Sequence, residues 1–506
     1  MFGIFKKKGA GIFRASTSVK SFAAAEVSTI LGPWKWDAGF SNDEIAHALT
    51  TIRTRSRDMQ KNSEHYARWL DLFVANVVGD VGFTFIPKPC KVVAKPDVDK
   101  DAAAFLKYHF WKWATNPAFA DLTGRKSFTA ICRLVAENWA RDGEGVVVID
   151  RHAQNPYGIS LRVVRPDALD ETMSGTGKQG PIRNGVEVDA ATLRPIAYYF
   201  RTSQEDQSAS YIGDKPTIRI PAADVLHVFI QHDECQTRGI SLGHAVLKKL
   251  KMLDEYNIAE LVAARDEANT VGIFHAPADR EEEIARLNDD KKASAFLCQK
   301  TEPDTKYVLP PGWDYDSHTP QHPNRELVAF KNTMLRDIAS GLCVEYANFA
   351  NDWAGVSFSS VRVGTLAERD HWRSLQAQMI EQFATPVFKA WLGSFLKLAA
   401  SGAYQSTDFE RLVEHEFRGR RWEWVDPMKD IKAAVIAVQH GWKTNEQVTA
   451  DYGGDYFDNI VDVANEQKTA KKLGLAEPPP PAAMPKDKDD EDDEDKKNPK
   501  PTNGKK

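Results

Sequence analysis

The stretch RGISLGHAVLKKLKMLDEYNIAELVAAR, residues 238–265, predicts more about the fold of this chain than any other. Ser241 can cap a helix, and the sequence after Gly243 predicts one unbroken helix over 243–268. Apolar residues at steps of three or four, or multiples of them, form a stripe along it: Val246, Leu250, Leu253, Leu261 and Ala264. Asn257 takes the place of a further leucine in this stripe. Because so long and mixed a helix is seldom buried inside one domain, we expect it to pack sideways in an assembly.

The composition is that of a globular protein. A length of 506 residues, of which 42% are hydrophobic, suffices for about three domains with substantial cores. The five cysteines lie far apart, are odd in number and form no C-x-x-C pair, so the sequence indicates neither disulfides nor a zinc site. No apolar run near the start has signal-peptide length, and none reaches the roughly 18 residues that cross a bilayer. We therefore expect a cytoplasmic protein without a membrane partner, and its net charge of −5 argues against one that coats nucleic acid.

The chain begins with a basic stretch, residues 1–40, which we expect to be a mobile arm. Whether this arm is plainly disordered, or touches DNA or a neighbouring subunit, stays open. A helix is expected to follow, with Arg53 and Arg57 one turn apart on its exposed face. These arginines could bind phosphate, but a solvated face, or one paired with a neighbour's acids, is favoured. A second helix is expected from Ser63.

Between Phe83 and Pro221 the pattern changes to short β-rich runs that are separated by Gly, Pro and Asn turns. One helix, expected over 127–140, interrupts these runs. The block therefore predicts the α+β class. The expected strands are 83–86, 145–149, 159–164, 196–200 and 217–220.

Beyond the opening helix, a small compact unit is expected over 269–322, with a Pro-rich exit, and then a helix over 323–343. The stretch 344–357 is rich in Asn, Ala, Gly and Ser, which predicts a mobile loop without large charge, although an ordinary interhelical loop stays possible. A long helix is expected over 358–396, followed by short helices with glycine stops. The tail from 477 is a run of prolines, acids and lysines that cannot form a core.

Several motifs occur in an order and spacing that resemble the portal proteins of tailed bacteriophages, lambda type. The Arg238-Gly-Ile-Ser turn, the leucine-rich helix after it and the string Ala-Glu-Leu-Val-Ala-Ala-Arg265 carry the resemblance first. Each motif is weak alone, but together they cover most of the chain, and their common order makes the resemblance specific. The others are Arg53–Asp58, Ala67-Arg68, Asn76–Gly79, Trp139–Glu144, Asn184–Val188, Ala197–Tyr199, Pro221–His227, Ser359–Arg362 and Trp424–Pro427.

The resemblance implies a portal-type fold: an α/β wing, long stem helices, a small α/β clip and a helical crown. The two stem helices would bracket the clip and line a channel, and a tunnel loop would form its narrowest point. The implied divisions are a wing over 41–242, stem helices over 243–268 and 323–343, a clip over 269–322, a tunnel loop over 344–357, a wing or crown helix over 358–396, a crown over 397–476 and a disordered charged tail over 477–506.

The resemblance further implies a homo-oligomeric ring, expected to be a dodecamer, at one vertex of the virion capsid, assembled in the host cytoplasm. Double-stranded DNA would pass through it during packaging and ejection. The implied partners are the terminase large subunit, head-completion or adaptor proteins, and the major capsid and scaffold proteins. A near-neutral or acidic chain suits such a pore, because each strong phosphate contact would retard the DNA.

The resemblance also implies where functional side chains lie. The tunnel loop would present Asn348, Asn351, Asp352, Trp353, Gly355 and Ser357 to the channel. The stem helix would carry Lys248, Lys249, Lys251 and Asn257, the last a polar break that neighbouring subunits and a wet channel tolerate. Arg238 and Arg362 are expected to contact a neighbouring subunit. No cofactor, metal or catalytic residue is implied.

Patterns for enzymatic chemistry are missing from the sequence. Gly175-Thr-Gly-Lys178 lacks the leading glycine and the hydroxyl residue of a P-loop, so no nucleotide site is predicted. Asp142-Gly-Glu144 indicates a turn into a strand rather than a catalytic carboxylate pair. His227, His232 and His275 lack ligand spacing, which favours structural histidines. Two alternatives stay open: a generic ring adaptor and, less favoured, an enzyme that processes nucleic acid.

Overall fold

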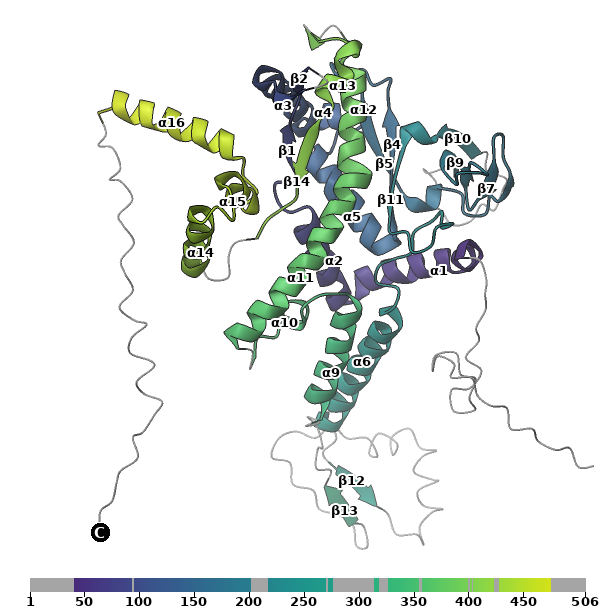
Figure 1. Ribbon diagram of the computed structural model, residues 1–506. Helices are drawn as coiled ribbons and strands as arrows, with labels where there is room; N and C mark the ends of the chain where they lie inside the picture. Colours follow the sequence, from purple (N-terminus) through teal and green to yellow (C-terminus); the bar gives the residue numbers. More distant parts are fainter. Residues whose placement is uncertain are drawn as a thin grey trace, which may run out of the picture.

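The computed structural model describes residues 41–92, 95–201, 217–269, 272–275, 314–317, 326–354, 357–398, 401–402, 404–422 and 427–474. Its body mixes helices with small antiparallel sheets, and one pair of helices extends from the lower end of this body (Figure 1). Three helices near the C-terminus stand beside the body. The predicted α+β class is therefore confirmed at the level of mixed helix and sheet.

The first two helices break where the sequence predicts. Helix α1 is Ser41–Asn62 and helix α2 is Glu64–Val77, with Ser63 between them. The α2 side chain of Phe73 is buried, and its ring meets the rings of Trp139 and Trp372 edge-on, at 5.6 and 5.8 Å between centroids. Such aromatic pairs stabilise a core beyond the area that they bury. Helix α2 therefore lies at the centre of the main core.

Helix α3, Lys100–Thr115, lies in the block where the sequence analysis expected only one helix. The Asp99 carboxylate caps it by accepting a hydrogen bond from the Ala102 amide at 3.1 Å. No element was predicted for these residues, but their helical spacing buries Phe110 and Trp113 on one side. The other elements of this stretch are α4 (Pro117–Ala120) and the hairpin of β2 (Cys90–Val92) and β3 (Lys95–Val98).

The two larger antiparallel sheets of the described residues shape the body. Helix α5, Phe128–Asp142, packs against a three-stranded sheet in the order β11-β4-β5. A five-stranded sheet in the order β10-β9-β8-β7-β6 projects from the side of the body opposite to the C-terminal helices (Figure 1). The five predicted strands are confirmed within one or two residues. The strands are β1 (Thr84–Pro87), β4 (Glu144–Asp150), β5 (Ser160–Val164), β6 (Gly175–Thr176), β7 (Pro181–Arg183), β8 (Val186–Val188), β9 (Pro195–Arg201), β10 (Thr217–Pro221), β11 (Val225–Phe229) and β14 (His415–Arg418).

The long C-terminal helix is continuous through a π-helical turn, Ile380–Ala384, which joins α11 (Phe358–Met379) to α12 (Thr385–Phe395). Pro386 is tolerated because it stands in the first turn of α12. The short helix α13, Phe409–Leu412, follows, and β14 then pairs with β1 of the body. Residues 404–422 therefore belong with the body rather than with the predicted crown. The helices beyond them are α14 (Pro427–Gln439), α15 (Asn445–Asp451) and α16 (Tyr456–Lys472).

Helices α6 (Leu247–Asn269) and α9 (Leu327–Gly341) form the antiparallel pair that extends from the body (Figure 1). Residues 242–246 form turns, so α6 begins later than predicted. Ser241 does not cap it, because its hydroxyl is buried and lies 3.4 Å from the Ala140 carbonyl. The chain segment that connects the two helices contains strands β12 (Gly272–His275) and β13 (Asp314–Ser317), which pair with each other. The predicted arm 1–40, the tail 477–506 and the remainder of 269–322 lie outside the described residues.

Candidate functional site

Helices α6 and α9 hold each other near the body. The Lys249 ammonium lies 3.1 Å from the Asp337 carboxylate, and the Tyr256 ring meets the Phe330 ring edge-on at 5.3 Å between centroids. The residues of the predicted stripe nearest the body are all buried: Val246, Leu250 and Leu253. The first half of the stripe is therefore covered within the chain itself, whereas the sequence predicted that the stripe would pack in an assembly.

The apolar stripe of α6 is buried near the body and becomes exposed in the second half of the helix. Leu261, a member of the same stripe, is 72% exposed. The exposed apolar residues of the two helices, which we call the stem face, are Met252, Tyr256, Ile258, Leu261, Val262, Val328 and Phe330. Large exposed apolar surfaces are uncommon on monomeric proteins. The predicted stem residues Lys248, Lys249 and Lys251 are exposed, and Asn257 is half-buried.

The stretch predicted as a mobile tunnel loop is a packed helix in its first half. Helix α10, Tyr346–Ala350, buries Phe349 completely. The side-chain amide of Asn348 donates to the Glu368 carboxylate of α11 at 2.7 Å. The main-chain carbonyl of Asn348 accepts from the Arg68 guanidinium at 2.9 Å. Asn348 therefore fixes α10 to α11 and α2 rather than standing free at a loop tip.

The exposed part of this stretch follows α10. Asn351 ends the helix in a left-handed conformation with φ 53°. The Asp352 carboxylate accepts hydrogen bonds from the Tyr346 hydroxyl at 2.8 Å and from the Ala354 amide at 3.1 Å, and these bonds lower the pKa of Asp352. Trp353 is 50% exposed. Trp353 is therefore the large apolar side chain that this loop presents outward.

The remaining predicted residues of this region lie at the start of α11. The Ser357 hydroxyl caps α11 by accepting from the Ser360 amide at 3.3 Å. Arg362 is 37% exposed and pairs with Asp430 of α14 at 3.2 Å, so it connects two helices of the same chain. Gly355 lies outside the described residues.

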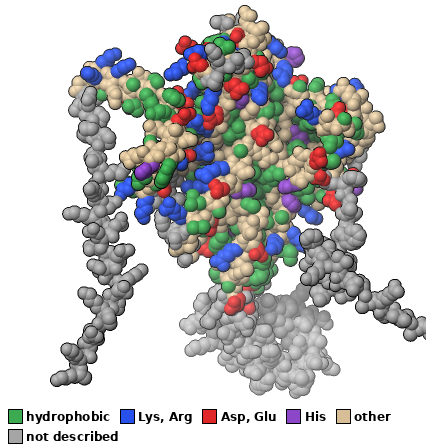
Figure 2. Space-filling view, viewed as in Figure 1, with side chains coloured by type: hydrophobic (Ala, Val, Ile, Leu, Met, Phe, Trp, Pro, Cys, Tyr) green, Lys and Arg blue, Asp and Glu red, His purple; other side chains and the backbone are tan. Residues whose placement is uncertain are grey.

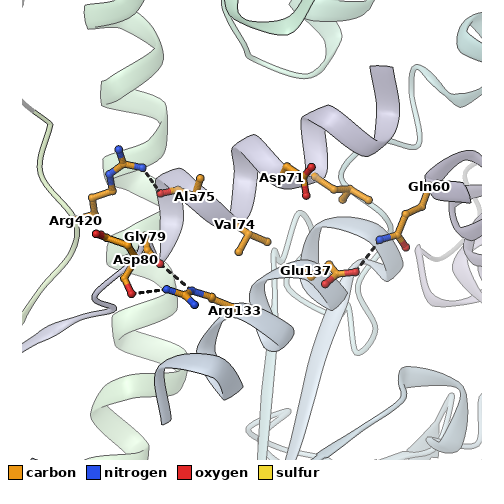
Figure 3. Close-up of a pocket in the computed structure, with 10 residues that line it drawn as sticks. Gln60, Asp71, Val74, Ala75, Gly79, Asp80, Arg133, Glu137 and Arg420 are labelled. Atoms are coloured by element: carbon orange, nitrogen blue, oxygen red, sulfur yellow. Dashed lines mark hydrogen bonds between the residues drawn. The ribbon is translucent and has the colours of Figure 1, made fainter. Parts of the chain in front are cut away.

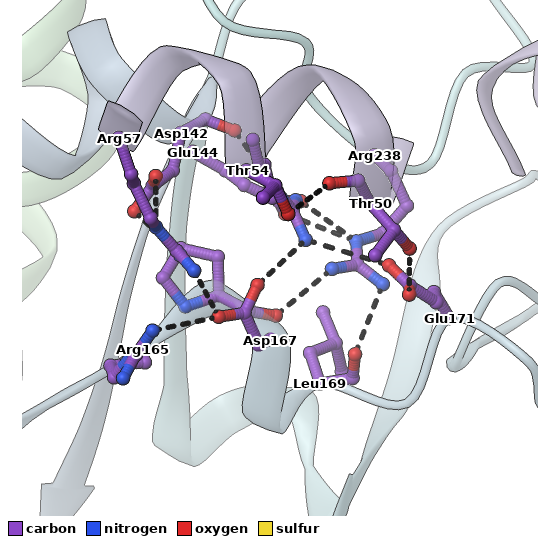
Figure 4. Close-up of polar contacts among 12 residues, drawn as sticks. Thr50, Thr54, Arg57, Asp142, Glu144, Arg165, Asp167, Leu169, Glu171 and Arg238 are labelled. Carbon is purple, nitrogen blue, oxygen red and sulfur yellow. Dashed lines mark hydrogen bonds and ion pairs between the residues drawn. The ribbon is translucent and has the colours of Figure 1, made fainter. Parts of the chain in front are cut away.

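A buried ion cluster lies where α6 leaves the body. Glu144, at the start of β4, is fully buried and binds Arg53 of α1, His227 of β11 and Arg238 of the turn before α6. Figure 4 shows Glu144 and Arg238 with the neighbouring residues Asp142, Arg57 and Asp167. The Arg238 Nε lies 2.9 and 3.1 Å from the two oxygens of Glu144. The other Arg238 nitrogens donate to main-chain carbonyls of Pro166, Leu169 and Asn184. Arg238 is therefore satisfied on every side within one chain.

Asp142, two residues before Glu144, is the second buried carboxylate of the cluster. The Arg57 guanidinium binds both of its oxygens, at 2.8 and 3.0 Å, and the Arg141 guanidinium also binds both, at 3.1 and 2.8 Å. Arg57 extends the cluster to Asp167 at 2.5 Å. Bidentate Arg–carboxylate pairs are the stronger kind of ion pair and fix direction as well as distance. The predicted turn at Asp142-Gly-Glu144 is confirmed, and both carboxylates also serve the cluster.

The cluster joins segments that are far apart in the sequence. Its partners on α1, β11 and the turn before α6 stand 83 to 94 residues from Glu144 or Asp142. Four of the motifs that carry the family resemblance meet there: Arg53–Asp58, Trp139–Glu144, Pro221–His227 and the Arg238-Gly239 turn. The sequence analysis treated these motifs separately. Helical and strand periodicity gives no signal that would have joined them.

Two glycines allow the turn before α6 to touch the turn between α5 and β4. Gly143 has φ +89°, and a Cβ there would lie 2.2 Å from the main-chain carbon of Ile240. A Cβ on Gly239 would lie 2.1 Å from the Gly143 carbonyl oxygen. The two backbones therefore pack directly on each other. This contact and the Arg238 bonds together set the position from which α6 leaves the body.

The opposite charges of the cluster stabilise one another and offset the cost of burying them. Burial alone would raise the pKa of the Glu144 carboxyl, but Arg238, Arg53 and His227 outweigh it and hold that pKa well below its usual value of 4.5. Burial also opposes the charge of Asp167, yet its bond to Arg57 lowers its pKa below the usual 3.8. Both carboxylates are therefore ionised at neutral pH.

Acid should destabilise the body through these two carboxylates. Because their pKa values are lower in the folded chain than in the unfolded chain, their contribution to stability is complete above about pH 4.5 and is lost as pH falls through the folded values. We expect the free energy of unfolding, from urea titrations followed by tryptophan fluorescence, to fall steadily below about pH 4. A curve that stays flat from pH 7 to 3 would contradict the assignment.

The predicted environments of three arginines are wrong. Arg238 is fully buried in the chain, so it cannot contact a neighbouring subunit from this position. Arg53 is 1% exposed and Arg57 is largely covered, whereas the sequence analysis placed both on an exposed face. The acids that pair with them belong to their own chain, at a distance in sequence that helix periodicity does not reveal. The structural role predicted for His227 is confirmed by its bond to Glu144.

An open pocket of about 590 Å³ lies between α2, α5 and the segment after β14 (Figure 3). Arg133 donates to the Gly79 carbonyl at 3.0 Å, and Arg420 donates to the Ala75 carbonyl at 2.5 Å. Carboxylates line its other side: Asp71 and Glu137. Across the residues that the structure describes, no group of three or more His, Cys, Asp or Glu is arranged to hold a metal ion. In the same part of the chain, no helix has the length and apolar character needed to cross a membrane.

Comparisons with known proteins agree with the motif order. Residues 28–376 match the family model described as phage portal protein, lambda family. The chain is 29% identical over 466 residues to a probable portal protein of Halomonas phage phiHAP-1, covering 91% of this chain and 89% of that protein. It is 22% identical to portal protein B of Escherichia phage lambda, covering 85% and 86%. A solved chain in the neck of an empty GTA particle matches with a TM-score of 0.44 and 12% identity, covering 84% of this chain and 97% of that chain.

The family match spans well over half of the sequence and includes the helix pair, the ion cluster and the stretch around α10. Its members are structural components of the virion rather than an enzyme family. The motifs that meet at Glu144 all lie within the matched residues. This chain belongs to the lambda family of phage portal proteins.

Proposed function

We propose that the chain forms a closed homo-oligomeric ring at one capsid vertex, through which double-stranded DNA is packaged and ejected. The observation that carries this proposal is the stem face, an exposed apolar surface on a helix pair in a member of the portal family. Each copy of the chain exposes this apolar surface, and a second copy of the chain can cover it. Contacts between different faces of successive copies close into a ring when the rotation permits.

The domain division follows the elements. We assign α6 and α9 to the stem, β12 and β13 to the clip, and the five-stranded sheet to the outward-facing wing. Helices α14, α15 and α16 form the crown; α15 and α16 bury no residue within the chain. Their exposed apolar side chains support packing against neighbouring copies in the ring: Met428, Ile431, Ile436, Phe457, Ile460 and Val461.

The loop after α10 is our candidate for the narrowest part of the channel. Trp353 and Asp352 stand in its exposed part, and Asn348 anchors α10 beneath them. In this arrangement α10 transmits movements of α11 to the loop, because the Asn348 bond to Glu368 joins the two helices. The clip would dock the terminase large subunit during packaging and head-completion proteins afterwards, and the crown and wing would meet the capsid and scaffold proteins. Twelve copies are expected in the ring.

Replacing Leu261 by Glu tests the stem face. The variant places a charge on every subunit contact that this face makes, and desolvating an unpaired carboxylate is costly. We expect native mass spectrometry to show rings for the unaltered chain and mainly monomers for the variant, with an unchanged far-ultraviolet circular dichroism spectrum.

The matched control is Ile218 to Glu, on a strand of the five-stranded sheet, where the side chain is 53% exposed. Because this sheet would face outward, the control should still form rings. Rings of normal size from the Leu261 variant would contradict the assignment of the stem face. A generic adaptor role would be favoured instead if capsids lacking this chain still filled with DNA.

A further inference from the structure

Arginines gather around Trp422 on the side of the body that faces the C-terminal helices. Arg369 and Arg373 stand one turn apart on α11, and their guanidinium carbons lie 5.8 and 5.9 Å from the centre of the Trp422 ring. Arg420 and Arg421 come from the segment that follows β14. We call these four residues the arginine cluster. In Figure 2, blue side chains appear on this side of the body, near the crown helices.

The backbone that presents Arg420 and Arg421 is held firmly. Gln376 of α11 is 3% exposed, and its amide donates to the carbonyls of Asn76 at 2.7 Å and of Arg420 at 3.0 Å. The Trp422 indole donates to the Asn76 side chain at 2.8 Å. A Cβ on Gly419 would lie 2.5 Å from the Gln376 side-chain oxygen, so the chain passes tightly over α11. The cluster is therefore a preorganised surface rather than a set of free side chains.

The positive charges of the cluster act against one another. Burial lowers the pKa of Arg369, and the nearby charges of Arg373 and Arg420 lower it further, against the opposing charges of Glu368 and Asp430. Burial and the charge of Arg373 likewise lower the pKa of Arg421, whose Nε is buried without a hydrogen-bond partner. Arg373 pairs with Asp370, but this pair is exposed on both sides. A fixed group of like charges concentrates anions from solution.

The geometry points to the phosphate groups of double-stranded DNA as the ligand of this arginine cluster. This inference deepens the proposed function and rests on it. Guanidinium groups bind phosphate oxygens in a two-point geometry that lysines do not offer. The elements that carry the cluster, α11 and the segment after β14, lie on the side of the body away from the five-stranded sheet, which is the side of the ring interior when that sheet faces outward (Figure 1). The close-up of the pocket shows Arg420 at the edge of the neighbouring hollow (Figure 3).

The acidic run of the chain itself, residues 487–495, is the other polyanion that such a cluster could bind. DNA is favoured because the elements that carry the cluster, α11 and the segment after β14, lie on the side of the body away from the five-stranded sheet (Figure 1). A small number of arginines on each subunit also suits a channel, because weak contacts repeated around a ring hold DNA without stopping its movement.

The test uses the assembled full-length ring and a fluorescent duplex whose binding is followed by anisotropy across a range of salt concentrations. The variant changes Arg373 and Arg420 to Gln. Each phosphate contact that is lost should reduce the slope of log affinity against log salt by about 0.9, which is about fivefold in affinity at roughly 0.15 M salt. We therefore expect about 30-fold weaker binding for two contacts in one subunit. Changing the same two residues to Lys should restore part of the salt slope and less of the affinity.

The matched control changes Lys91 and Lys443 to Gln, since both are exposed and paired with exposed acids, as Arg373 is. This control removes the same number of positive charges as the arginine variant, and it should bind DNA nearly as the unaltered ring does. The inference is overturned if the arginine variant binds like this control. It is also overturned if the variant no longer forms rings, which would assign the arginines to the subunit interface. A third contrary result is unchanged DNA affinity together with Arg-dependent binding of a peptide of residues 487–495. Absence of rings from the unaltered chain would instead refute the proposed function.

Discussion

Replacing Glu144 by Gln is expected to lower the free energy of unfolding by about 3–5 kcal/mol, because it removes the charge that two buried arginines share. Arg238 and Arg53 would keep their positive charges in a site without solvent. The amide of Gln has nearly the shape of the carboxylate, so packing changes little and the loss reports the charge. Urea titration of the unassembled chain, followed by tryptophan fluorescence, measures it.

The control for this variant is Asp97 to Asn, which breaks a pair with Lys91 that is exposed on both sides. Exposed pairs contribute little to stability, so this control should change the unfolding midpoint only slightly. Equal losses from the two variants would show that the Glu144 cluster contributes no more than a surface ion pair. The Glu144 variant should also lose part of the acid sensitivity of the unaltered chain, since one of the two depressed pKa values is gone.

Replacing Gly143 by Ala should destabilise the chain through two separate effects. An alanine held in the left-handed region costs roughly 1–2 kcal/mol. Its Cβ would also lie 2.2 Å from the Ile240 backbone, and forcing such overlap apart costs about 1–3 kcal/mol more. Because Ile240 belongs to the turn before α6, the displacement should also move α6 and impair ring formation. Urea titration gives the stability loss, and native mass spectrometry gives the assembly state.

Gly124 provides the matched control for this variant. Its φ is +67°, also in the left-handed region, but no atom lies within 4 Å of the place where a Cβ would stand. Alanine there should cost only the conformational part and leave ring formation intact. If alanine at the two positions lowered stability equally, the close contact between the two turns would not contribute to the stability of the fold.

Local patterns in the sequence were sufficient for much of the fold. The start of the second helix at Ser63, the helix over 127–140 and the strand at 145–149 depend on neighbouring residues, and all three are present in the structure within two residues. Helix α3 was missed, since no element was predicted for its residues. Spacing over its whole length would have favoured a helix.

The ion cluster could not be predicted in the same way. Arg53 and Arg57 have the spacing of an exposed helix face, and only the approach of α5 and β4 turns that face inward. Arg238 was expected at a subunit contact on the family resemblance alone. Its burial depends on Glu144, 94 residues earlier in the chain. Such pairs are set by tertiary contacts, which helical or strand periodicity does not encode.

For the stem face, the apolar residues were predicted from the sequence, but the extent of their burial was not. The apolar stripe of α6 was predicted as one continuous surface, but the body covers only its first half. Where burial ends depends on how far the helix extends beyond the body, which is a property of the folded chain. The exposed remainder, including Leu261, is the part that a neighbouring copy has to cover.

Electron cryo-microscopy of the purified full-length chain tests the central claim most directly. The account predicts closed rings with an axial channel, in which α6 and α9 surround the channel as packed pairs and the five-stranded sheets lie at the outer rim. A chain that stays monomeric under all assembly conditions, or rings whose α6 and α9 helices lie at the outer rim, would contradict it.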